Sequence, residues 1–191
     1  MPVLKHVLLA TLFLVPGTPE TIQQPSTADL FFLLGDWEVE RINSPGLPEE
    51  RRRHGTLSCR ETLDAQYIRC QYVIPRIDAL PSRDDVYFNY NPIYERFESL
   101  WLSSTWPIKV LMHGSVTVEA DTVVLRHSAE FPIENGVMEF VRGELHYDAT
   151  TDSFERRTHI RTSEYAPGDW RHHMTEVARK VSGPPQPMQQ N

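Results

Sequence analysis

The sequence predicts an all-β protein, an antiparallel up-and-down β-barrel of about eight to ten strands. From Trp37 onward, apolar and polar residues mostly alternate, which is the period of a strand with one buried face. Short turn sequences separate the alternating segments, so successive strands are joined as hairpins. Strands arranged in this way tend to curl and close, because closure removes the exposed sheet edges. A flat sandwich of two sheets is the alternative.

The first 24 residues are expected to be a signal peptide and a short leader, outside the barrel. Lys5 and His6 precede an unbroken apolar run, Val7–Val15, and Pro16 and Gly17 follow it. This is the layout of a secretory signal, and the run is shorter than the roughly 20 apolar residues that span a bilayer. We therefore expect an exported protein, periplasmic or extracellular, with no transmembrane segment in the mature chain. An N-terminal membrane anchor or a disordered leader is the alternative.

The first predicted elements lie around the sequence FFLLGDWEVERI. Asp29–Leu34 is expected to form a short helix that closes one end of the barrel. Gly35 then allows the chain to turn sharply, because glycine tolerates backbone conformations that other residues avoid. Trp37–Ile42 follows as the first strand, with Trp37 at its head.

The next two strands, Gly55–Glu61 and Tyr67–Ile74, are predicted to form a hairpin with its turn near Asp64. In that hairpin Cys59 and Cys70 face each other as a non-hydrogen-bonded pair, whose side chains are close enough for a disulfide. An exported protein meets the oxidising conditions that a disulfide needs. Two buried free thiols are the alternative. Two cysteines alone make no zinc site, and no metal site is predicted.

The remaining strands follow from the same alternation, each bounded by turn residues such as those at Asn91–Pro92, Glu119–Asp121 and Ala166–Asp169. The barrel domain is expected to span 25–181, and 182–191, which is rich in Pro and Gln, is expected to be a disordered tail. The remaining predicted strands are Val86–Tyr90, Arg96–Leu102, Lys109–Val118, Thr122–Phe131, Val137–Asp148, Ser153–Arg161 and Trp170–Val181.

The triplet Gly35-Asp36-Trp37 resembles the Gly-x-Trp that opens the first strand in lipocalins and related calycin barrels. Over Leu30–Val181 the pattern is similar to that of uncharacterised bacterial lipocalin-like secreted proteins. The resemblance implies that Trp37 closes the barrel floor with an arginine of the last strand against it, here Arg179. An ordinary buried tryptophan without that partner is the alternative. Haem-binding barrels of the nitrobindin type also open with Gly-x-Trp.

Alternation also places polar side chains on the inner face of the barrel. His127 lies among apolar residues of its strand, Arg156 shares a face with Phe154, and His172 and Glu176 share a face in the last strand. Because unpaired buried charge costs several kcal/mol, Arg156 and Glu176 on consecutive strands are predicted to pair. The predicted ligand-binding residues are Tyr90, Phe97, Trp101, Met112, His127, Arg156, His172 and Glu176.

This mixed interior favours a protein that binds a small hydrophobic or amphipathic molecule with an acid or carbonyl group. A formal net charge of -7 argues against nucleic acid as a partner. No nucleophile elbow, HExxH motif or phosphate loop is present, so no catalytic residue and no cofactor is predicted. The alternatives are an enzyme that uses Glu176 or a histidine as general base, a haem barrel with His172 or His173 as ligand, and an envelope protein with a filled barrel.

Overall fold

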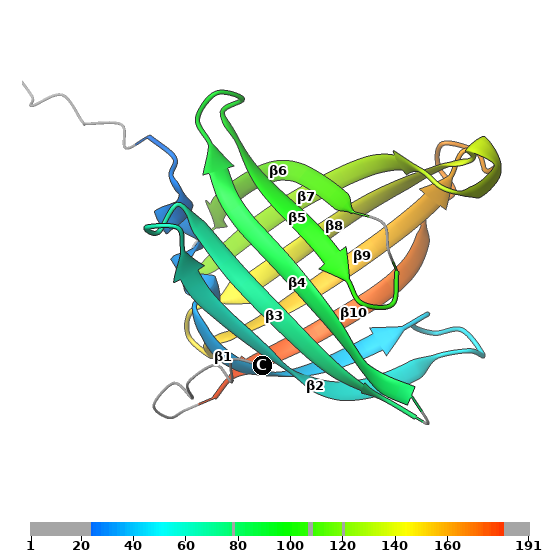
Figure 1. Ribbon diagram of the computed structural model, residues 1–191, viewed down its shortest axis with the longest axis horizontal. Helices are drawn as coiled ribbons and strands as arrows, with labels where there is room; N and C mark the ends of the chain where they lie inside the picture. The colour runs from blue at the N-terminus through cyan, green and yellow to red at the C-terminus, as the bar shows by residue number, and fades with distance from the viewer. Residues whose placement is uncertain (1–23, 78, 107–108, 120, 182–191) are drawn as a thin grey trace, which may run out of the picture.

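The structure, a computed structural model, describes residues 24–181 apart from 78, 107, 108 and 120. Ten antiparallel strands close into one barrel, in which consecutive strands pair and the first strand pairs with the last (Figure 1). The prediction of an all-β, up-and-down barrel is confirmed, and the sandwich alternative is excluded. Residues 1–23 of the predicted signal peptide and leader over 1–24, and the predicted tail over 182–191, lie outside the described residues.

Most strands extend beyond the bounds that alternation predicted, because pairing in the barrel continues into the turns. A 3-10 helix, η1 (Thr27–Leu33), precedes the barrel, and a second one, η2 (Glu134–Gly136), lies in the turn before β8. The strands are β1 (Gly35–Asn43), β2 (Arg51–Thr62), β3 (Tyr67–Arg76), β4 (Ala79–Asn91), β5 (Arg96–Ser103), β6 (Val110–Glu119), β7 (Thr122–Pro132), β8 (Met138–Asp148), β9 (Ser153–Thr162) and β10 (Arg171–Lys180).

One end of the barrel is closed by η1, which is blue in Figure 1. Leu30 and Leu33 of this helix are buried in the core. The indole Nε1 of Trp37 donates a hydrogen bond to the backbone oxygen of Leu33 at 2.9 Å, and its ring packs on Phe154 with centroids 5.1 Å apart. Trp37 therefore joins the closing helix to the barrel core, which is the structural role expected of it.

The predicted partner of Trp37 is wrong by one residue. Trp37 pairs across the closure with Lys180, whose Nζ lies 5.1 Å from the centre of the indole ring. Arg179 is exposed on the outer face instead. Because neighbouring residues of a strand point to opposite faces, a shift of one position exchanges the inner residue for an outer one. The cation over the tryptophan is therefore a lysine.

The predicted Cys59–Cys70 disulfide is confirmed. The two residues are directly opposite in the register of β2 and β3, and their sulfur atoms are bonded. Both side chains are fully buried in the core near η1. The bridge therefore ties the second and third strands together inside the barrel.

The interior is divided along the barrel axis. The half near η1 is filled by a continuous apolar cluster that includes Leu57, Ile68, Val86 and Leu145. The loops that join β1 to β2, β5 to β6, β7 to β8 and β9 to β10 lie at the opposite end (Figure 1). A smaller cluster of Val110, Met112, Ala129 and Phe131 lines the wall there. The half near η1 is filled with side chains, whereas the opposite half holds a cavity.

We predict that replacing both cysteines, as Cys59→Ala/Cys70→Ala, lowers the free energy of unfolding by about 2–3 kcal/mol. The bridge closes a short loop, with a sequence separation of 11, and so restricts the unfolded chain. Urea unfolding followed by circular dichroism measures the change. The wild-type chain reduced with dithiothreitol is the control and should lose a similar amount; an unchanged unfolding midpoint in both would contradict the prediction.

Candidate functional site

A cavity of about 250 Å³ lies inside the barrel in the half away from η1. Its deepest lining residues come from strands that are far apart in the sequence. They are Arg41 of β1, Asp84 of β4, Trp101 of β5, His127 of β7 and Arg156 of β9. In four of these strands the next inward residue toward η1 belongs to the filled core, and in β5 it is the buried Ser99, so these five side chains form the floor of the cavity.

The walls above this floor are largely apolar, and the mouth is polar. The apolar lining consists of Val110, Met112, Val141, Ile160 and Met174. The polar lining nearer the loops consists of Asn43, Ser82, Ser103, Thr105, Glu139 and His173, with Trp106 beside them. Thr158 lies lower, between Arg156 and Ile160 on β9. An apolar wall with a few polar groups at its two ends is the usual composition of a small-molecule site.

The floor is organised by one buried carboxylate, Glu176 of β10, which is 0% exposed. Arg41 Nε donates to Glu176 Oε1 at 2.7 Å, and Arg41 Nη1 donates to Asp84 Oδ2 at 3.1 Å. Arg156 forms an ion pair with the second oxygen of Glu176. The predicted pair of Arg156 and Glu176 is therefore confirmed, as part of a larger network of four charges.

The network favours the charged forms of Glu176 and Arg41. Burial alone would raise the pKa of Glu176, but the charges of Arg156 and Arg41 outweigh burial and hold that pKa below its ordinary value. Burial opposes the charge of Arg41 as well, yet Glu176 and Asp84 raise the pKa of Arg41 above its already high value. Two guanidinium groups and two carboxylates therefore coexist in a space that is almost closed to solvent.

Aromatic rings also pack against the guanidinium groups of Arg41 and Arg156. Arg156 lies over Trp101, with its Cζ 4.5 Å from the ring centroid, and Arg41 lies 5.2 Å from the ring of Tyr72. Tyr72 and Trp101 stack on each other at 5.7 Å. These cation–π contacts fix the planes of both arginines. Burial raises the pKa of Tyr72, so the phenol remains neutral beside them.

His127 has space because glycines flank it in the sheet. Its cross-strand partners are Gly114 on β6 and Gly143 on β8. A Cβ on Gly143 would stand 2.2 Å from the imidazole Nε2, so any other residue there would displace the ring. Burial, and then the charge of Arg156, lowers the pKa of His127 to about 3, so the ring is neutral near pH 7.

The predicted ligand-binding residues divide into those near the cavity and those away from it. Trp101, Met112, His127 and Arg156 line it, and Glu176 lies behind the floor, bonded to both arginines. Tyr90 and Phe97 also point inward, but they pack on each other in the filled half, with ring centroids 5.1 Å apart. Alternation identifies the inner face but not the depth along the barrel axis.

His172 does not share the inner face with Glu176, contrary to the prediction. The register of β10 against β9 shifts between His172 and Met174, so one extra residue reverses the alternation. His172 pairs with His159, and their rings stack at 4.9 Å away from the cavity. His173, at the shift, lines the mouth of the cavity in its place.

Sequence reasoning did not select Arg41, Asp84 or Glu139, although all three line the cavity. The signal was present: Arg41 is in phase with Trp37 and Val39, and Asp84 is in phase with Val86. Charged residues toward strand ends are usually solvated, so alternation alone gave no reason to place them inside. Glu139 is partly buried at the mouth, and this burial raises the pKa of its carboxyl group.

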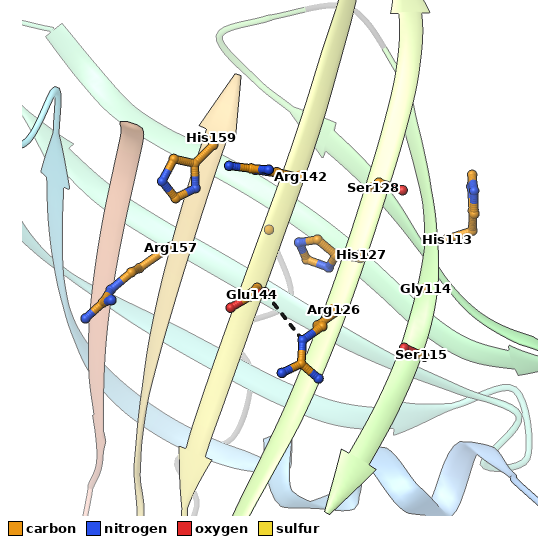
Figure 2. Close-up of a pocket in the computed structure, with 11 residues that line it drawn as sticks. His113, Gly114, Ser115, Arg126, His127, Ser128, Arg142, Glu144, Arg157 and His159 are labelled. Atoms are coloured by element: carbon orange, nitrogen blue, oxygen red, sulfur yellow. Dashed lines mark ion pairs between the residues drawn. The ribbon is translucent and has the colours of Figure 1, made fainter. Parts of the chain in front are cut away.

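A wider hollow of about 580 Å³ lies on the outer side of the same wall (Figure 2). Its arginines are already engaged with neighbours. Arg126 pairs with Glu144 at 3.4 Å, along the dashed line in Figure 2, and Arg142 lies over the ring of Trp170 at 4.4 Å. Arg157 pairs with Glu155 on its own strand. We interpret this hollow as a solvated, charge-paired surface.

Within the described part of the chain, no helix is long and apolar enough to cross a membrane. No group of three or more His, Cys, Asp or Glu side chains is placed there to hold a metal ion.

Comparison with known proteins supports the fold and leaves the family open. No protein-family description matches the chain, and no curated protein matches it. Among solved structures, the crystal structure of Rv2717c from M. tuberculosis is similar, with a TM-score of 0.62 and 12% sequence identity. The match covers 81% of this chain and 96% of that one. The ten-strand barrel is consistent with a lipocalin-like architecture, and membership of that family stays a prediction.

We predict that Glu176→Gln lowers the free energy of unfolding at pH 7 by about 3–5 kcal/mol, because it leaves two buried guanidinium groups with one fewer counter-charge. Urea unfolding measures the change. The matched control is Glu155→Gln, whose exposed pair with Arg157 should contribute less than about 1 kcal/mol. Equal losses in the two variants would contradict the prediction.

The same carboxylate predicts how stability changes in acid. In the folded chain the pKa of Glu176 is lower than the ordinary value of 4.5, which applies to the unfolded chain. As the pH falls below about 4.5, the unfolded chain is therefore protonated before the folded chain. This contribution to stability is therefore complete at neutral pH and is lost as the pH falls through the folded pKa. Glu176→Gln should show a shallower decrease in the free energy of unfolding below pH 4.5 than the wild type does.

Proposed function

We propose that this chain is an exported, lipocalin-like protein that binds a small, mainly apolar molecule inside the barrel. The observation that carries this proposal is the cavity of about 250 Å³ with its apolar wall and polar floor. Its size can be compared with an engineered cavity of about 150 Å³ that binds benzene. A single ring with a short polar substituent therefore fits the available volume.

The arrangement of side chains indicates how such a molecule would lie. The apolar wall of Val110, Met112 and Val141 would contact its hydrocarbon part. Its polar end, an acid or a carbonyl group, would lie near Arg156 and His127 on the floor. His172 has no part in this proposal, because it lies on the outer face.

Export is part of the proposal and rests on the N-terminal sequence. The buried Cys59–Cys70 disulfide is compatible with it, since such bonds persist in oxidising compartments.

The enzyme alternative has less support from the site. A general base works best with a pKa near the working pH, whereas the pKa of His127 is lowered to about 3 by burial and by Arg156. Glu176 is fully buried behind two arginines. The haem alternative would rest on His173 alone, which lines the mouth beside the small cavity. A barrel filled throughout would leave no cavity of this volume.

We predict that filling the cavity with Val141→Trp weakens binding of acetophenone at least about tenfold, because the larger side chain occupies the ligand's space. Titration calorimetry with the full chain exported from a bacterial host measures the affinity. Val118→Trp is the matched control, since Val118 is 73% exposed, and it should bind as the wild type does. Equal affinities for the filled and control variants would contradict binding in the barrel.

A further inference from the structure

The floor of the cavity is balanced in charge. Arg41 and Arg156 carry two positive charges, and Glu176 and Asp84 carry two negative charges within ion-pair distance of them. His127 adds no charge, because burial and the neighbouring Arg156 lower its pKa to about 3. A ligand that reaches this floor therefore meets a buried set of groups that needs no further ion.

The same floor is not balanced in hydrogen bonds. Arg41 Nη2 and Arg156 Nε are buried and have no hydrogen-bond partner among the described residues. Both side chains line the cavity and are at least nine-tenths buried, with exposed fractions of 9% and 2%. The ring of Trp101 attracts the charge of Arg156 but offers no oxygen acceptor. His127 Nδ1 is also without a partner in the described chain.

We propose that the ligand's polar end is a neutral hydrogen-bond acceptor, such as a ketone, ester or amide carbonyl oxygen, directed at these arginines. This inference rests on the proposed function and narrows it to one chemical class. A neutral oxygen accepts the free N–H groups without adding charge, which is what a charge-balanced but donor-rich floor requires. A hydrocarbon alone would leave the same donors unpaired.

A carboxylate suits the floor less well, although arginines usually bind carboxylates. Each guanidinium group already faces at least one carboxylate, so an added anion would give the buried set a net negative charge. It would also lie in a cavity lined by Asp84 and Glu139. Burial already raises the pKa of Glu139, which indicates that the mouth disfavours negative charge.

The test uses three probes with one shared ring and different polar ends: acetophenone, which is a neutral acceptor, benzoate, which is an anion, and ethylbenzene, which has no polar end. Titration calorimetry of the full chain at pH 7 should show acetophenone binding at least about tenfold more tightly than either of the others. If benzoate or ethylbenzene binds as tightly as acetophenone, the neutral-acceptor inference is overturned, whereas the proposed binding of a ligand in the cavity is not. Binding by none of the three would overturn the proposed function as well.

A variant assigns the preference to the floor. Arg156→Lys keeps a positive charge opposite Glu176 but removes the planar set of donors. It should bring the affinities for acetophenone and ethylbenzene to within about threefold of each other. Arg41→Lys, on the other side of Glu176, gives a second test where the first variant fails to fold. If Arg156→Lys and Arg41→Lys each fold and each still bind acetophenone about tenfold more tightly than ethylbenzene, the assignment to these arginines is overturned.

Discussion

The buried carboxylate of Glu176, held between Arg41 and Arg156, is the interaction on which the rest of the interior depends. It stands where the filled half of the barrel ends and the cavity begins. A buried ion pair is often no more stabilising than apolar side chains of similar volume, because both ions lose their hydration. An apolar floor would therefore satisfy the fold equally well. We infer that the four charges occupy this position because the floor contacts the polar end of a ligand, and that their contribution to net stability is secondary.

The position of this network follows from the closure of the barrel. Arg41 is opposite Glu176 where β1 meets β10, and Arg156 is opposite Glu176 where β10 meets β9. Each of these pairs lies across adjacent strands, although Arg41 and Glu176 are 135 residues apart in sequence. Asp84 reaches Arg41 from β4, which does not pair with β1. The network therefore connects the first and last strands with β4 across the interior of the barrel, and it forms only once the sheet has closed.

This dependence explains how much the sequence could predict. Alternation identified all ten strands, and hairpin register placed Cys59 opposite Cys70, because both are local properties. Lys180 was missed because its phase against Trp37 depends on the register of closure. His172 was misplaced because a bulge leaves little trace in a pattern of residue types. Tyr90 and Phe97 were assigned to the ligand site because depth along the barrel axis depends on strand stagger, which alternation does not encode.

The floor and the mouth of the cavity differ in how freely they could change, and this bears on ligand selection. The floor is fixed by backbone as well as by charge: a side chain at Gly143 would strike His127, and a Cβ at Gly114 would stand 1.7 Å from the backbone oxygen of Arg126. Trp106 and Glu139 at the mouth carry no such constraint from the network. The polarity of the ligand's inner end would therefore be set by the floor, whereas the size and shape of its outer end would be set by the mouth. Substitutions at the mouth should alter which molecules of one chemical class bind, and substitutions at the floor should alter the class itself.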